Sequence, residues 1–189
     1  MASSAKRVLS SLRAASAQAL VLVLFACGPS RPAGDPVGVS RGAEEGPVAF
    51  EYDSLDARPV SSQALRGKPS VLAFITTWDI SSQAETDFLV AMAKNDQTRV
   101  NYALVALDDR KNRELVEEYA RMLKVTFPVA TADAETTMGK GGFGVMAVPT
   151  VVILDEESRV FFRKAGIVKP DEIRAQLAAL EKRKTLRPR

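Results

Sequence analysis

The chain has 189 residues, 46% of them hydrophobic and 26% charged, which suits one globular domain with a processed segment or tail. Histidine is absent and there is one cysteine, which excludes Ser-His-Asp and Cys-His nucleophilic sites, histidine-containing metal sites, intramolecular disulfides and CxxC pairs. The net charge of +3 comes from Lys6, Arg7 and Arg13, and the remaining 23 basic and 23 acidic residues balance, so there is no electrostatic case for nucleic acid as a partner.

Residues 1–26 are predicted to be a lipoprotein signal peptide. A weakly basic stretch without acids leads into the apolar run Leu20–Ala26, which is too short to span the ~30 Å hydrocarbon core of a bilayer. The sequence LFAC that ends at Cys27 resembles the lipobox of bacterial lipoproteins, in which a peptidase cuts before a lipid-modified cysteine. The resemblance implies lipid attachment at Cys27 and a membrane as partner. An ordinary secretory signal that is cut elsewhere, or an uncleaved anchor, is the alternative.

Residues 27–46 are predicted to form a flexible tether that begins at the lipidated Cys27. This segment is rich in glycine, proline, serine and charged residues, and it contains no pattern that would build a core. A thioether at Cys27 would leave the mature protein without a free thiol. The folded domain is expected over residues 47–189.

From Pro47 onward the chain alternates strand and helix signals. Val48–Tyr52 and Arg58–Val60 are predicted to form a small hairpin. Val71–Thr76 and Val100–Leu107 are continuous apolar runs, which is typical of strands buried on both faces. The other predicted elements are a helical turn over 61–65, helices over 81–94, 112–123 and 132–138, an extended stretch over 126–130, strands over 150–154 and 159–164, and a last helix that Pro170 opens.

Helical spacing predicts which side chains of the three longer helices point inward. They are Ala84, Phe88, Ala91 and Met92 in the first, Leu115, Val116, Tyr119, Met122 and Leu123 in the second, and Ile173, Leu177 and Leu180 in the last. Strand-helix-strand alternation implies a parallel pair, and the late strand pair adds antiparallel strands. The expected architecture is an α/β fold, with a central mixed β-sheet flanked by helices on both faces.

Several stretches resemble the TlpA/ResA-like branch of thioredoxin-fold proteins. They are FEYDSLD at 50–56, LRGKP at 65–69, the strand that leads to Trp78, FPV at 127–129 and FGVMAVPTVVILD at 143–155. The resemblance covers about residues 47–180 and implies a thioredoxin-like fold. Members of the family are often periplasmic and membrane-tethered. This agrees with the lipobox and implies a lipid-anchored protein of the bacterial cell envelope that faces the periplasm.

The family's active-site motif is altered in this chain. In the family, a strand ends in a tryptophan followed by Cys-x-x-Cys, and the first thiolate is stabilised at a helix N-terminus. Here Trp78 is followed by Asp79-Ile80-Ser81-Ser82, so Asp79 and Ser82 occupy the two cysteine positions. Thiol–disulfide exchange needs both sulfurs, and a serine hydroxyl without a histidine base does not replace them. The resemblance alone implies a thiol-disulfide oxidoreductase, whereas these residues predict no catalytic residue and no thiol redox activity.

The altered motif also reads as a capped helix start. Asp79 places a carboxylate at the helix N-terminus, and Ser82 with Glu85 matches the S-x-x-E capping box. Non-thiol catalysis by Asp79 is the alternative.

The resemblance implies a peptide-binding segment at Val148-Pro149-Thr150. In the family this proline is cis, faces the cysteine pair, and lies beside backbone that takes up an extended peptide by β-strand addition. A proline that serves the fold alone is the alternative. The predicted role is binding of a peptide or protein in envelope redox or assembly processes.

No cofactor and no metal are predicted. Gly139–Gly144 spells GxGxxG, but a helix signal precedes it and a strand follows, the reverse of a dinucleotide-binding unit. Asp108 and Asp109 could bind a cation at a strand end, although such acids are more typical of loops and helix caps.

Overall fold

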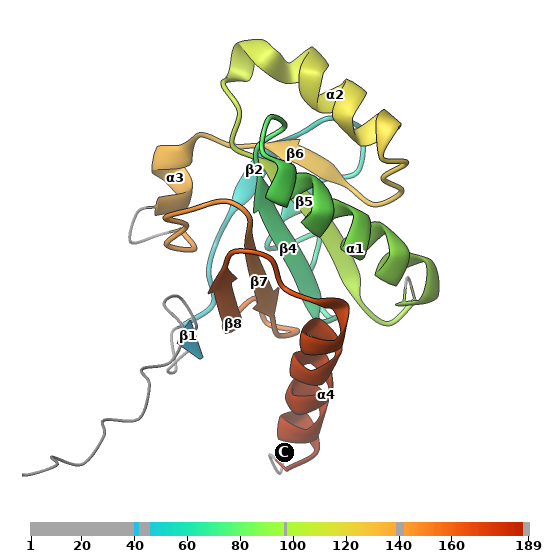
Figure 1. Ribbon diagram of the computed structural model, residues 1–189. Helices are drawn as coiled ribbons and strands as arrows, with labels where there is room; N and C mark the ends of the chain where they lie inside the picture. Colours follow the sequence, from blue (N-terminus) through green and yellow to red (C-terminus); the bar gives the residue numbers. More distant parts are fainter. Residues whose placement is uncertain (1–39, 42–45, 97, 139–141, 187–189) are drawn as a thin grey trace, which may run out of the picture. The chain divides into compact units, whose positions relative to one another are not determined.

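A computed structural model of the protein describes residues 40–41, 46–96, 98–138 and 142–186 (Figure 1). All of these belong to one of the chain's two contact units, Asp35–Arg189. The predicted signal peptide, Cys27 and most of the predicted tether lie outside the described residues. Among the described residues, no helix is both long and apolar enough to cross a membrane.

A mixed β-sheet forms the centre of the unit. Its strands, within the described residues, are β1 (Ser40–Arg41), β2 (Glu51–Ser54), β3 (Val60–Ser61), β4 (Ser70–Ile75), β5 (Asn101–Ala106), β6 (Val129–Thr131), β7 (Thr150–Leu154) and β8 (Val160–Ala165). Their order is β1-β8-β7-β4-β5-β6-β2-β3. The pairs β4–β5 and β5–β6 are parallel and the other neighbours are antiparallel, which confirms the predicted mixed sheet. The strand β1 belongs to the segment predicted as a tether.

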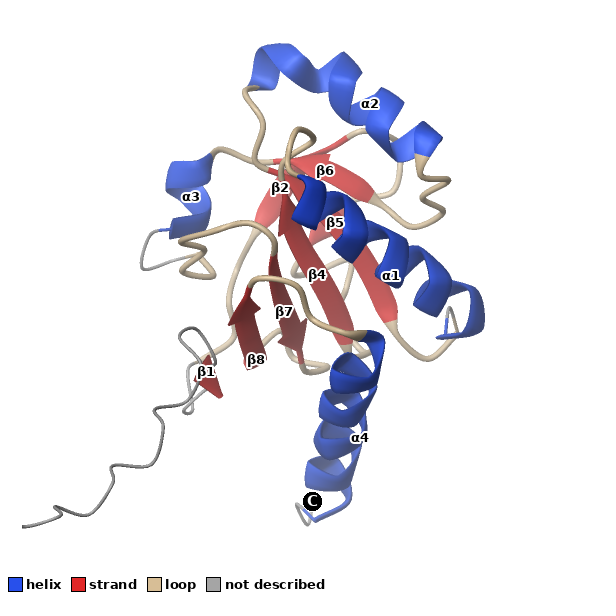
Figure 2. Ribbon diagram, viewed as in Figure 1, coloured by secondary structure: helices blue, strands red, loops and turns tan. Residues whose placement is uncertain are grey.

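Helices lie on both faces of the sheet (Figure 2). They are α1 (Ile80–Asp96), α2 (Arg113–Met122), which follows a 3₁₀ turn at Arg110–Asn112, α3 (Ala134–Met138) and α4 (Pro170–Leu186). Buried side chains of α1, α2 and α4 pack in one core with Val71, Ala73 and Ile75 of β4. The short α3 belongs to the other face, because its Thr137 carbonyl accepts the Val145 N–H at 3.2 Å and Val145 lies in the second core.

The second core is rich in aromatic side chains. Phe74 of β4 lies 5.4 Å from Phe143 and 6.1 Å from Tyr52, measured between ring centroids, and Phe50 lies 5.1 Å from Phe143. The edge-to-face and tilted geometries are those that aromatic pairs prefer. This packing connects the segment before β7 to the strand β4, so it contributes to the placement of the candidate site.

The helical faces differ from the sequence prediction. In α1 the buried side chains are Ser82, Glu85, Thr86, Leu89, Val90, Met92 and Ala93. Of the predicted inward residues only Met92 is buried, and Ala91 is exposed. In α2, Val116 and Tyr119 are buried as predicted, whereas Leu115 and Met122 are exposed. The prediction for α1 was wrong because three polar side chains, Ser82, Glu85 and Thr86, lie on its inward face. Each of them has a hydrogen-bond partner in the neighbouring elements.

Candidate functional site

The chain leaving β4 and the chain entering β7 lie at the same end of the sheet. The strands are adjacent and antiparallel, and Phe74 is paired with Thr150. Residues 76–79 therefore follow β4 at the end where residues 146–149 precede β7. The sheet brings the altered motif and the Val148-Pro149-Thr150 segment together, as the resemblance implies.

Asp79 caps the N-terminus of α1. Its Oδ2 accepts the Ser82 N–H at 2.6 Å and the Ser82 hydroxyl at 2.8 Å. The Asp79 carbonyl accepts the Gln83 N–H at 3.1 Å, which begins the helical pattern. Hydrogen bonds from the Ser82 hydroxyl and from the Ser82 and Ser81 N–H groups lower the pKa of Asp79 below its usual value. The carboxylate is thus an anion that satisfies helix donors, as an N-cap does.

Ser82 is fully buried, and its hydroxyl has two partners. It donates to Asp79 and accepts the Thr76 N–H at 3.3 Å, which joins the end of β4 to the first turn of α1. The Ser82 hydroxyl is therefore not exposed to a substrate in this structure. The two positions that the resemblance assigns to the family's sulfurs thus hold two side chains that are hydrogen-bonded to each other and to backbone N–H groups.

The turn that carries Trp78 is held by Asp108. The Asp108 carboxylate accepts the Thr77 hydroxyl at 2.6 Å and the Thr77 N–H at 3.0 Å. Asp109 accepts the Lys111 N–H at 3.1 Å and pairs with the Lys111 ammonium at 2.9 Å. The carboxylates of Asp108 and Asp109 therefore stabilise the loops that follow β4 and β5. No group of three or more metal-ligating side chains occurs in the part of the chain that the structure describes.

The Val148–Pro149 peptide bond is cis. Pro149 and Thr150 are buried and Val148 is half-buried. The Thr150 hydroxyl donates to the Ala147 carbonyl at 2.6 Å, and the Pro149 carbonyl accepts the Gly166 N–H at 2.7 Å. These bonds connect the start of β7 to residues 166–169, which join β8 to α4.

Large apolar side chains are exposed around this end of the sheet. Trp78, Ile80, Met146 and Ile167 are exposed by 77%, 83%, 76% and 43%, and we call these four residues the apolar rim. Trp78 and Ile80 flank Asp79, Met146 precedes Pro149 by three residues, and Ile167 follows Gly166. Exposed apolar side chains that gather in one region typically mark an interaction surface.

Glu85 is the functional candidate that sequence reasoning placed incorrectly. It does not form the predicted capping box with Ser82. Its side chain is fully buried, and its Oε2 accepts the Val168 N–H at 2.7 Å. Burial raises the pKa of Glu85 to about 7, an effect that the Val168 N–H partly offsets. The signal for this position was the spacing of Leu89, Val90 and Ala93, because the same face extended toward the N-terminus contains Glu85.

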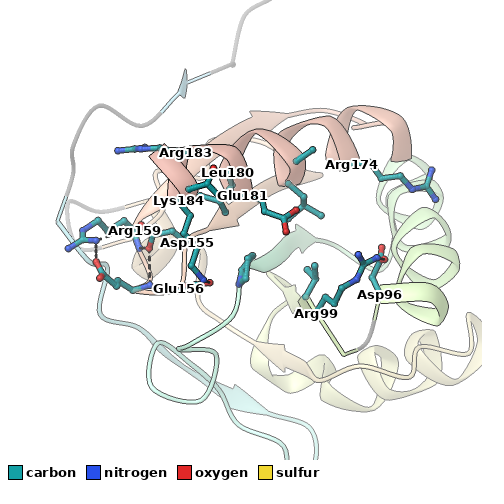
Figure 3. Close-up of a pocket in the computed structure, with 16 residues that line it drawn as sticks. Asp96, Arg99, Asp155, Glu156, Arg159, Arg174, Leu180, Glu181, Arg183 and Lys184 are labelled. Carbon is teal, nitrogen blue, oxygen red and sulfur yellow. Dashed lines mark hydrogen bonds and ion pairs between the residues drawn. The ribbon is translucent and has the colours of Figure 1, made fainter. Parts of the chain in front are cut away.

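A large groove of about 1090 Å³ lies elsewhere (Figure 3). Its lining includes Pro69, which precedes β4, and Asp155, which follows β7, so it lies at the opposite end of β4 from Asp79. Several of its charged side chains form ion pairs with one another, such as Lys184 with Glu156 at 2.6 Å and Arg99 with Asp96 at 3.1 Å. The groove is separate from the residues that the resemblance singles out, and the candidate site remains at the end of β4 that carries Asp79.

Solved structures show which fold this is. The chain is 25% identical to DsbF of Mycobacterium tuberculosis, solved in mixed oxidized and reduced forms, with 70% of this chain and 96% of that chain covered and a TM-score of 0.59. A DsbF homologue of Corynebacterium diphtheriae is 19% identical, with 79% and 96% covered and a TM-score of 0.68. A secreted disulfide oxidoreductase of M. tuberculosis, described as homologous to DsbE of E. coli, is 22% identical, with 70% and 97% covered and a TM-score of 0.58.

These likenesses confirm the thioredoxin-like fold. The neighbours are thioredoxin-fold thiol:disulfide interchange proteins, which matches the TlpA/ResA-like resemblance of the sequence. No family model matches the chain, and no curated protein matches it.

The cap at Asp79 can be tested by substitution. We expect Asp79→Ala to lower the free energy of unfolding by about 1 kcal/mol, because the Ser82 N–H loses its acceptor. Asp79→Asn keeps an acceptor oxygen and should lose only a few tenths of that amount. Urea denaturation at pH 7 measures both, with Ser81→Ala as the matched control in the same helical turn. An Asp79→Ala variant as stable as the wild type would contradict the capping role.

Burial of Glu85 makes stability depend on pH. In the folded protein the Glu85 carboxyl group keeps its proton up to about pH 7, whereas in the unfolded chain it releases the proton near pH 4.5. Between these values the folded state binds more protons, so its stability falls as the pH rises, by roughly 3 kcal/mol in total, and it levels off above 7.

The Glu85→Gln variant should lose this part of the pH dependence, because the amide does not titrate. Denaturation at pH 5, 6, 7 and 8 measures the slope, and Glu51→Gln, at an exposed position of β2, is the control. Equal slopes for Glu85→Gln and the wild type would show that Glu85 titrates alike in the folded and unfolded states.

Proposed function

We propose that this protein is a membrane-tethered thioredoxin-like lipoprotein without thiol redox activity, and that it binds an extended peptide segment of a partner protein in the bacterial cell envelope. The lipid would be attached at Cys27, and the domain would face the periplasm. The binding surface would comprise the apolar rim and the Val148-Pro149-Thr150 segment. The protein would act as an accessory component of envelope redox or assembly processes.

The observation that carries this proposal is that the Asp79 carboxylate and the Ser82 hydroxyl are hydrogen-bonded to each other and are thus already engaged. The resemblance assigns both side chains to the positions of the family's sulfurs, and in the structure they bond to each other and to backbone donors. The frame around them supports binding, because Trp78, Ile80 and Met146 remain exposed beside it. A rigid frame with exposed apolar anchors suits peptide recognition, in which backbone pairing supplies affinity and side-chain contacts supply specificity.

The rival function is thiol–disulfide exchange, which the fold alone suggests. Exchange requires a thiolate that attacks a disulfide and a second thiol that resolves the mixed disulfide. The chain contains no cysteine after Cys27. An oxidoreductase of this fold would therefore need its sulfurs from another molecule.

A restored motif tests the redox part of the proposal. We expect the full chain in detergent to reduce a disulfide-bonded protein substrate no faster than buffer with reductant alone. The double variant Asp79→Cys, Ser82→Cys should gain turnover, because the helix N-terminus that now binds Asp79 would stabilise a thiolate. The single variant Ser82→Cys, which lacks the attacking thiolate, is the control. Turnover by the wild type would refute the proposed loss of redox activity.

Site-specific crosslinking tests the binding part. A photo-crosslinking amino acid at Met146, in the apolar rim, should capture one extended segment of a partner in intact bacterial cells. The matched control is Leu115, which is also exposed but lies on α2. A Cys27→Ser variant should move the protein and its captured partner out of the membrane fraction. Identical products from positions 146 and 115, or none from 146, would contradict a binding surface at the rim.

A further inference from the structure

We infer that the protonation state of Glu85 controls whether residues 166–169, the segment that joins β8 to α4, stay packed against α1. In the closed arrangement the protonated side chain holds this segment against α1. Opening of the segment exposes Glu85 to water and releases its proton. Rising pH therefore favours the open arrangement.

The geometry places a single carboxyl group between two elements. Glu85 belongs to the second turn of α1, and its Oε2 accepts the Val168 N–H at 2.7 Å. Both residues are fully buried. The other oxygen, Oε1, has no hydrogen-bond partner among the described residues. A buried carboxylate with one donor is costly, whereas the neutral acid leaves less unsatisfied polarity.

The charges around Glu85 do not compensate its ionisation. Lys164 of β8 lowers the pKa of Glu85 and Glu172 of α4 raises it. These two side chains pair with each other at 2.7 and 2.8 Å, so the ammonium already has a carboxylate partner. Desolvation by burial is the largest influence and raises the pKa to about 7.

The other elements packed on α1 offer Glu85 no counter-charge. Strand β4 contributes no ionisable side chain. The Tyr102 hydroxyl of β5 donates to Asp96 at the far end of α1, and the Tyr119 hydroxyl of α2 is bonded to Thr86 at 3.0 Å. Residues 166–169 therefore contact α1 through a carboxyl group that, between about pH 4.5 and 7, keeps its proton only while it stays buried.

The segment is connected to the apolar rim. It contains Ile167, and its Gly166 N–H donates to the Pro149 carbonyl at 2.7 Å. Opening would displace one rim residue and remove a hydrogen bond from the segment that precedes β7. The consequence for peptide binding rests on the proposed function, but the opening itself does not.

Hydrogen exchange of single amides tests the inference on the full chain in detergent micelles. Protection of the Val168 amide, corrected for the intrinsic pH dependence of exchange, should fall about tenfold per pH unit between pH 5 and 7, since each opening releases one proton. Above pH 7 the protection should level off. In Glu85→Gln the protection should not change with pH, while the amide oxygen still accepts the Val168 N–H. An equal fall in this variant would overturn the inference, and so would a Val168 amide that exchanges with those of β4 at every pH.

A second measurement needs no variant. The ¹³C shift of the Glu85 carboxyl carbon should titrate with a midpoint near 7, together with the Gly166 and Val168 amide shifts. A midpoint near 4.5 would refute the inference. Neither measurement involves a peptide, so a failure of the proposed binding function would leave both results unchanged. A failure of the inference about Glu85 would likewise leave the crosslinking result unchanged.

Discussion

Strand β4 is the constraint on which the rest of the structure depends. All six of its side chains are buried, so its backbone groups must find partners within the sheet. It is parallel to β5 on one side and antiparallel to β7 on the other. The parallel partner requires a crossover, which α1 supplies, and this helix must begin where β4 ends. The antiparallel partner brings the cis proline segment to the same end. The position of the candidate site thus follows from the pairing of one strand.

The residues at that position differ from those that the resemblance to the family implies. A helix N-terminus favours an anion, and in thiol:disulfide interchange proteins of this fold that anion is a reactive thiolate. Here the anion is the Asp79 carboxylate, which is saturated by the N–H and hydroxyl of Ser82. Ser82 in turn binds the end of β4 through the Thr76 N–H. The electrostatic preference that activates sulfur elsewhere stabilises a closed cap in this chain, while Trp78 and Ile80 beside it remain exposed.

The sequence allowed the strands and the thioredoxin-like fold to be predicted, because continuous apolar runs and the resemblance of motifs agree. Strand β5 lies within one residue of its predicted bounds at each end, and the last helix begins at Pro170 as predicted. The inward face of α1 could not be predicted from hydrophobic spacing, since Ser82, Glu85 and Thr86 lie on it. The capping box was assigned to Ser82 and Glu85, whereas the structure uses Asp79 and Ser82. Local patterns cannot show that an ionisable side chain finds its partner 83 residues later in the chain.

The buried polar face of α1 joins three separate parts of the domain. Ser82 binds the end of β4, Thr86 binds Tyr119 of α2, and Glu85 binds the segment before α4. The first two contacts are between neutral groups, and each hydroxyl has a partner. Glu85 alone brings an ionisable group with an unpaired oxygen. A glutamine would make the same bond to Val168 without a proton to lose, so packing alone does not require a carboxyl group. What the carboxyl group adds is sensitivity to pH, at the one contact of the three that leads on to Ile167 and Pro149.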